Sequence, residues 1–201
     1  MQQTQLQATQ INSTRKLVTI PLLAAVAFLL QYLEIQLPLF PYFLKLDFST
    51  VPSLIGGLVF GPAAGILIEF IKNTLHFLLK GAEGLMIGEL ANFIAGASFV
   101  FVTVSIHRWI KGGKGLFTGL VLGTVLMTVI MSVANYYFLM PAYATVYNMP
   151  LDQMIQSFGF ESLWSLIIVA ILPFNIVKGV AASLVAYPVF VKMAPRLRVH
   201  V

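Results

Sequence analysis

Long apolar stretches, separated by short breaks that carry charge, glycine or proline, are the feature that most limits what this chain can fold into. Of the 201 residues, 59% are hydrophobic and only 9% are charged, whereas about a quarter of the residues of a soluble domain carry a charge. A helix needs about 20 consecutive apolar residues to cross a bilayer, and several stretches reach that length. The sequence therefore predicts an all-α integral membrane protein.

Six apolar stretches follow one another as predicted transmembrane helices. One continuous apolar run is divided at Gly61-Pro62, because glycine tends to end a helix and proline to begin one. The helix before this break has only about 12 residues, so we expect it to be tilted or partly buried by its neighbours. The predicted spans cover residues 17–37, 49–60, 62–79, 85–104, 116–137 and 162–190.

Basic side chains gather at the loop ends that a six-span chain would place on one side of the membrane. The positive-inside rule then puts both termini in the cytoplasm and explains the net charge of +5 without a nucleic-acid partner. Residues 1–14 are rich in Gln and Thr and lack the apolar core of a signal peptide, so we expect a flexible cytoplasmic tail. Residues 15–201 then form a single six-helix membrane domain. The basic residues are Arg15, Lys16, Arg108, Lys111, Lys114, Lys192, Arg196 and Arg198.

Polar residues inside the predicted spans concentrate toward the external side, beneath two aromatic loops at residues 38–48 and 138–160. A charged or amide group at membrane depth is costly unless it meets a partner or water. A pocket open to the exterior is the simplest explanation of this distribution. The residues concerned are Gln31, Glu34, Glu69, Lys72, Asn73, His76, Glu89, Asn92, Asn135, Asn175 and Lys178.

Asn175 and Lys178 are the most informative of these residues. Their spacing of three places both side chains on one face of a helix. No acid lies within two turns of Lys178 in the same span, so its partner must come from elsewhere in the chain or be a ligand. Glu69 and Lys72 have the same spacing, and they either neutralise each other or take part in a site.

No metal site is expected. The chain has no cysteine, and His76 with Glu69 provides fewer than the three converging ligands that a metal requires.

Small residues line parts of three spans and allow close approach of helix backbones in lipid. Either packing within the bundle or docking of another membrane protein explains them. They are Gly115, Gly119 and Gly123 in the fifth span, Ala24, Ala25 and Ala27 in the first, and Ala181, Ala182 and Ala186 in the sixth.

Four sequence blocks resemble a known family. They are residues 45–52 (KLDFSTVP), 56–62 (GGLVFGP), 71–73 (IKN) and 175–178 (NIVK). On these blocks the chain resembles the substrate-binding (S) subunits of energy-coupling factor (ECF) vitamin transporters, and within them the riboflavin-binding branch. The likeness extends from the first span to the sixth.

The resemblance implies a bacterial plasma-membrane protein that captures riboflavin from outside and catalyses no reaction. Riboflavin is then the transported ligand, and no cofactor is expected. A transmembrane coupling (T) subunit and two cytoplasmic ATPases would drive its release inside. By the same resemblance, Asn135, Asn175 and Lys178 contact the ligand, the loop after the first span closes over it, and Ala24, Ala25 and Ala27 face the coupling subunit.

Riboflavin chemistry fits these residue types. The flavin edge alternates carbonyls with an imide N–H, which the carboxamide of an asparagine can match as donor and acceptor. We expect Phe43, Leu46 and Phe48 to form apolar walls, with Asp47 beside them at the site. Glu89 and Asn92 suit the ribityl hydroxyl groups.

Other functions remain open at this point. The chain could be an S subunit for another vitamin such as thiamine or biotin, or an ion-coupled carrier that uses Glu69, Lys72 and His76 as a relay. No nucleotide-binding loop of the G-x-x-x-x-G-K-[ST] type occurs, and neither G-x-S-x-G nor H-E-x-x-H is present. The sequence therefore predicts a protein that is not an enzyme.

Overall fold

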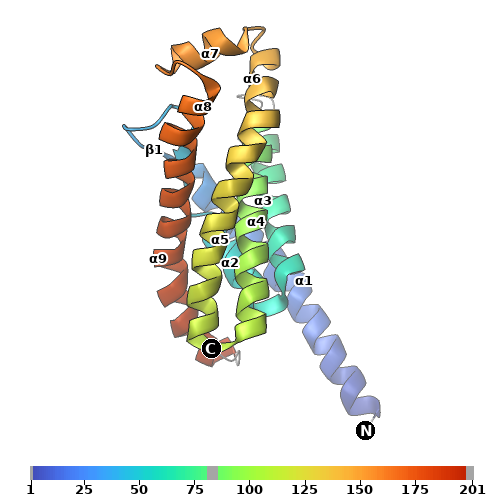
Figure 1. Ribbon diagram of the computed structural model, residues 1–201. Coiled ribbons are helices and arrows are strands. Elements are labelled where there is room, and N and C mark those ends of the chain that lie inside the picture. The colour runs from blue at the N-terminus through green and yellow to red at the C-terminus, as the bar shows by residue number, and fades with distance from the viewer. Residues whose placement is uncertain (1, 81–85, 198–201) are drawn as a thin grey trace.

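The computed structural model describes residues 2–80 and 86–197 and is almost entirely helical (Figure 1). The basic turn between α4 and α5 lies at the same end of the molecule as the start of α1 and the end of α9, while the two-stranded hairpin and α7 lie toward the other end. The elements are α1 Gln2–Tyr32, β1 Ile35–Gln36, β2 Lys45–Leu46, α2 Thr50–Phe60, α3 Pro62–Lys80, α4 Ile87–Ile110, α5 Gly112–Ala134, η1 Asn135–Leu139, α6 Met140–Val146, α7 Leu151–Ser157, α8 Leu163–Leu166, η2 Ile167–Ile171 and α9 Leu172–Leu197.

Four helical segments of the described chain are long and apolar enough to cross a membrane. They are Thr14–Tyr32, Ile87–Ile110, Gly112–Val146 and Leu163–Ala194. The other two predicted spans correspond to α2, which is short, and α3, which carries Glu69 and Lys72. Residues Thr50 to Leu58 of α2 are all buried, as expected for a helix too short to face lipid along its length.

The first helix differs from its predicted limits at both ends. The helical backbone begins at Gln2, so it includes residues that we expected to form a flexible tail. It ends at Tyr32 instead of residue 37, because Ile35 and Gln36 pair with Leu46 and Lys45 in an antiparallel hairpin. The loop that joins α1 to α2, residues 33–48, is therefore folded, and we call it the strap.

The fifth predicted span is longer than expected because a wide helical turn lets it continue past Pro141, and a similar turn lies before Pro173 within the sixth span. The Met140 amide reaches back five residues to the Asn135 carbonyl in η1, and helix then continues through Pro141 to Val146. The Leu172 amide does the same to the Ile167 carbonyl in η2, directly before Pro173. Proline has no N–H to donate within a helix, and such π-turns are frequent at functional sites.

The glycines of the fifth span serve packing within the bundle. A Cβ on Gly119 would lie 2.6 Å from the backbone oxygen of Thr103 in α4. The Thr103 hydroxyl donates a hydrogen bond to the Gly119 carbonyl at 3.1 Å. Glycine is thus what allows α4 and α5 to lie in backbone contact.

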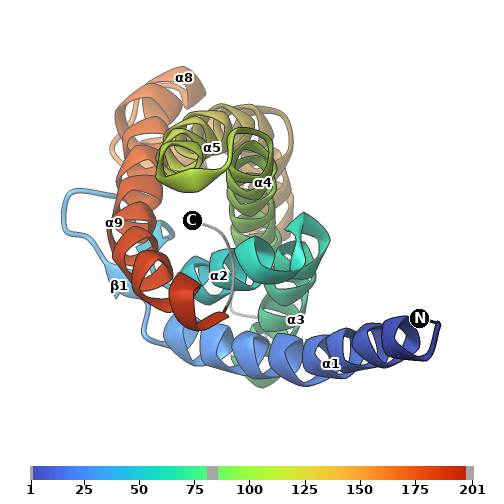
Figure 2. The same ribbon diagram turned by 90° about the horizontal axis from the view of Figure 1, so that it is seen from below.

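The alanines of the first span are divided between two surfaces, which corrects the predicted docking face. Ala24 and Ala27 are fully buried in a small cluster with Ile68 of α3, while Ala25 is exposed. Figure 2 shows α1 lying along α2 and α3 at the margin of the bundle. Two of the three alanines are therefore unavailable to a partner, because helix packing inside this chain uses them.

Candidate functional site

A cavity of about 490 Å³ lies beneath the strap, between α3, α4, η1, α6 and α9. Its volume falls within the range of about 300–1,000 Å³ that is common for small-molecule sites. Seven of the predicted ligand-binding residues line it, and they are Phe43, Asp47, Glu89, Asn92, Asn135, Asn175 and Lys178. Leu46 is buried outside the cavity, and Phe48 packs against the main hydrophobic core.

Asn135 and Asn175 present their carboxamides in similar ways. The Asn135 amide nitrogen donates to the Met131 carbonyl at 2.7 Å, and that of Asn175 donates to the Ile171 carbonyl at 2.8 Å. Each bond uses one of two N–H groups and lies beside a π-turn. Neither carboxamide oxygen accepts a hydrogen bond from the described residues, so each side chain keeps an acceptor and one donor for a ligand.

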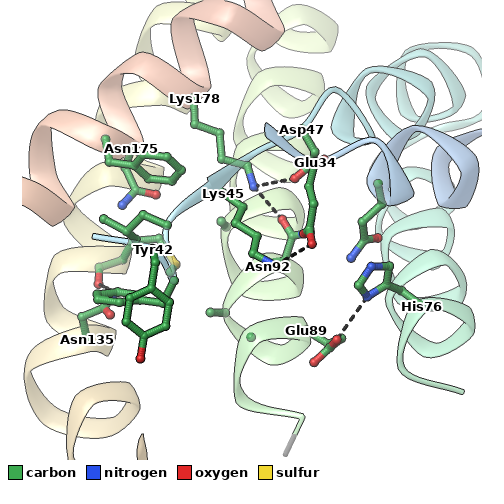
Figure 3. Close-up of a pocket in the computed structure, with 18 of the residues that line it drawn as sticks. Glu34, Tyr42, Lys45, Asp47, His76, Glu89, Asn92, Asn135, Asn175 and Lys178 are labelled. Atoms are coloured by element: carbon green, nitrogen blue, oxygen red, sulfur yellow. Dashed lines mark hydrogen bonds and ion pairs between the residues drawn. The ribbon is translucent and has the colours of Figure 1, made fainter. Parts of the chain in front are cut away.

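Lys178 obtains its partner from a distant part of the chain. Its ammonium donates to Asp47 Oδ2 at 3.1 Å and to Asn92 Oδ1 at 2.7 Å (Figure 3). Asp47 and Lys178 are 131 residues apart in sequence. Asp47 Oδ1 also accepts from the backbone amide of Ser49 at 2.9 Å, which anchors the strap to the start of α2. The lysine that sequence analysis left unpaired is therefore neutralised by a strap residue.

Glu69 and Lys72 form an ion pair of 2.9 Å and are both fully buried. Neither side chain lines the cavity. Lys72 also donates to the Ser49 hydroxyl, which in turn donates to Asp47. Glu69 and Lys72 thus neutralise each other's charge, and Lys72 holds Asp47 in place through the Ser49 hydroxyl.

His76 belongs to a different part of the site. Its Nδ1 lies 3.1 Å from Glu89 Oε1, and both residues line the cavity. The described residues contain no group of three or more His, Asp or Glu side chains that could hold a metal. Among the described residues, no hydrogen bond or ion pair between side chains joins His76 to Glu69 or Lys72, so the three do not form the continuous relay that an ion-coupled carrier would need.

Two buried polar atoms of the cavity lining lack partners. Gln31 Oε1 and His76 Nε2 make no hydrogen bond to the described residues, although both side chains are almost completely buried. A buried polar group left unpaired costs about 1–3 kcal/mol. Each atom is almost completely covered by protein, so a ligand hydroxyl group reaches it only after the side chain rotates. The sequence predicts an outer position for both residues, but it assigns no role to Gln31 and gives His76 one only in an ion relay.

Aromatic side chains close the opposite part of the cavity. Phe43 of the strap lies 5.0 Å from Phe158 and 6.3 Å from Tyr143, measured between ring centroids. Tyr42, Tyr143 and Phe174 also line the cavity. They were not predicted, because an aromatic residue facing lipid and one facing a ligand look alike in sequence.

Charged side chains of the strap meet α3 at the edge of the cavity. Glu34 Oε1 accepts from Lys45 at 2.7 Å and also from Lys80 at the end of α3. Burial raises the pKa of the Glu34 carboxyl, but the hydrogen bonds and charges of Lys45 and Lys80 outweigh it, so its pKa lies below the ordinary value. The carboxylate is therefore ionised at neutral pH and ties the strap to the bundle.

Figure 3 shows how the two kinds of side chain divide the site. Asn135, Asn175 and Tyr42 lie on one side, with Glu89 and His76 on the other and Lys178 between them. An aromatic and amide region next to a region of charged and unpaired polar groups suits a flat heteroaromatic ring with a polar tail. Fold and cavity together define a membrane-embedded binding protein for a small solute of this kind.

Comparison with known proteins places the chain within a family. Residues 15–190 match the family described as ECF transporter, substrate-specific component. The chain is 38% identical over 182 residues to "Riboflavin transporter FmnP" of Bacillus subtilis, covering 90% of this chain and 93% of that protein. It is 36% identical over 188 residues to "Riboflavin transporter RibU" of Staphylococcus aureus, covering 94% and 95%.

A solved structure of the S component of a bacterial ECF transporter has the same fold. It superposes with a TM-score of 0.77 at 35% identity, over 92% of this chain and 98% of that one. This chain therefore belongs to the substrate-specific (S) components of ECF transporters. The family consists of transporter components, which agrees with the prediction that the protein is not an enzyme.

Proposed function

We propose that this chain is the riboflavin-binding S component of an ECF-type vitamin transporter. The observation that carries the proposal is the pair of amides in the cavity, Asn135 and Asn175, each with an uncommitted oxygen. The flavin edge offers an imide N–H between two carbonyls, which this pair can match. The relatives named as riboflavin transporters support the same ligand.

The rest of the cavity fits the remaining parts of riboflavin. Phe43, Tyr143 and Phe174 provide apolar surface for the ring system. Lys178 can donate to a ring carbonyl or nitrogen while it keeps one of its two protein partners. Gln31, His76 and Glu89 line the other region of the cavity and provide polar surface for the ribityl hydroxyls. A site of this kind rejects vitamins without the matching polar edge, because its own buried groups would be left unpaired.

We propose the same membrane orientation that the charges predict, with six membrane helices and both termini in the cytoplasm. The basic turn at Arg108, Lys111 and Lys114 lies at the end of the molecule where α1 begins and α9 ends. The strap and the cavity lie toward the opposite end, which then faces the exterior. Riboflavin would thus be captured at the outer surface of the plasma membrane.

Delivery into the cell then depends on a transmembrane coupling subunit and two cytoplasmic ATPases, because no nucleotide-binding loop occurs in this chain. The exposed side of α1, which includes Ala25, is the docking surface that we propose for the coupling subunit.

Titration of the purified protein with riboflavin tests the ligand. Binding quenches flavin fluorescence, and an excess of thiamine or biotin leaves the quenching unchanged. Absence of quenching at micromolar riboflavin, or displacement by either other vitamin, would contradict the proposal. Uptake that follows a proton gradient without any ATPase would instead indicate an ion-coupled carrier.

A further inference from the structure

The clasp formed by Glu34, Lys45 and Lys80 is an unusual arrangement of charge at the edge of the cavity. Both ammonium groups donate to the same carboxylate oxygen, Glu34 Oε1. All three residues line the cavity. One negative charge thus stands between two positive charges, and the clasp as a whole carries one net positive charge.

The clasp lies beside the polar region of the cavity. Glu34 and Glu89 both line the cavity, and Glu89 is paired with His76. Asn135, Asn175 and the aromatic side chains occupy the other region (Figure 3). A flavin whose ring lies against the two asparagines therefore directs its side chain toward His76, Glu89 and the clasp.

We propose that Glu34 is a specificity-determining residue that favours the neutral flavin over its phosphate ester, flavin mononucleotide. This inference rests on the proposed function, because it takes riboflavin as the ligand. Glu34 occupies the two lysines that a terminal phosphate would otherwise bind. Riboflavin ends in a hydroxyl group and leaves the clasp intact.

The physical reason is competition between two anions for one pair of cations. A phosphate monoester carries about −1.5 to −2 charges at neutral pH and binds strongly to ammonium groups. Placed near the clasp, it must displace Glu34 from Lys45 and Lys80 or accept the repulsion of Glu34 and Glu89. Removing the Glu34 charge frees both lysines for the phosphate.

The test compares the dissociation constants for flavin mononucleotide and riboflavin by fluorescence quenching in one detergent preparation. In Glu34→Gln, the dissociation constant for flavin mononucleotide divided by that for riboflavin falls by at least about tenfold. A gain of one charge-assisted hydrogen bond to the phosphate has this magnitude. The matched control is Glu161→Gln, which removes one charge from an exposed residue outside the cavity. Its ratio equals that of the parent.

Two further measurements make the result decisive. Adding Lys80→Gln to Glu34→Gln reverses most of the gain. The gain in Glu34→Gln also declines as salt is raised, because the half-buried charges of the clasp are partly screened by salt. An unchanged ratio in Glu34→Gln, with riboflavin binding retained, overturns the proposal.

The single variant Lys80→Gln provides an independent check if Glu34→Gln does not fold. It raises the ratio, because only one cation is left for either anion, and an unchanged or lower ratio counts against the proposal. Failure of the parent to bind riboflavin would instead contradict the proposed function, so the two failures are distinguishable.

Discussion

Asn175 combines a structural bond with a free acceptor, and this division of roles can be tested. Replacement by Ala removes the acceptor offered to the flavin imide, while the lost hydrogen bond to Ile171 is local to one helix turn. We expect riboflavin affinity to fall by about 1–3 kcal/mol, or roughly 5- to 150-fold. The midpoint of thermal unfolding without ligand should change little.

Isothermal titration and thermal unfolding of the same sample measure the two effects of Asn175→Ala. Gln153→Ala is the matched control, because Gln153 is an exposed amide outside the cavity. Equal affinity of Asn175→Ala and the parent would place the flavin edge elsewhere.

Glu34 predicts a defined dependence of ligand release on pH. Its pKa is lowered, so the clasp is complete above the ordinary glutamate pKa of about 4.3 and is lost as the pH falls through the lowered value. Riboflavin should leave Glu34→Gln faster than the parent at pH 5–7, because the clasp holds the strap over the cavity, and the two rates should converge only below the lowered pKa of Glu34.

The rate at which bound flavin is displaced measures this difference. Any pH effect of the neighbouring pair His76 and Glu89 is present in both proteins, so it cancels when Glu34→Gln is compared with the parent. Convergence of the two rates between pH 7 and 5 would mean that the Glu34 pKa is raised, contrary to its contacts with Lys45 and Lys80.

At the scale of helices and turns, each of the two π-turns lies beside one of the cavity asparagines, Asn135 and Asn175. Pro141 was placed in an external loop, but the wide turn before it lets the helix continue, whereas the predicted sixth span already included Pro173. A proline in sequence shows only that a regular bond is missing, and it does not show whether the helix ends or widens. The upper part of the fifth span was therefore missed.

Pro173→Ala restores the missing N–H and allows a regular helix through η2. The register of Asn175 relative to Asn135 would then shift. We expect thermal stability to be equal to the parent or higher and riboflavin affinity to fall by at least about tenfold, the cost of a misplaced hydrogen bond. Circular dichroism during heating and flavin titration measure the two quantities. An unchanged affinity would show that the π-turn does not position Asn175.

For the molecule as a whole, composition was sufficient to predict the helical class and an externally grouped set of polar residues. The ion pairs between residues far apart in the chain could not be predicted from the sequence. Nothing local links Asp47 with Lys178, or Glu34 with Lys80, because each pair is formed only when the strap folds back on the bundle. The site residues on helices were thus easier to predict than the contacts that hold the strap over them.

The same limit applies to the surface that would face a coupling subunit. A run of alanines indicates close packing but does not show which side of the helix is inside the chain. The structure divides them, with Ala24 and Ala27 buried and Ala25 exposed. Ala27→Leu should therefore destabilise the isolated protein, because overpacking a core costs about 1–3 kcal/mol.

Ala25→Leu should instead leave unfolding and riboflavin binding unchanged, since its side chain points away from the bundle. If the exposed side of α1 meets the coupling subunit, this variant should lower ATP-dependent riboflavin uptake in cells. Uptake assays paired with flavin titration separate the two effects. Normal uptake by Ala25→Leu would move the docking surface away from this side of α1, whereas weakened flavin binding would show that Ala25 supports the fold.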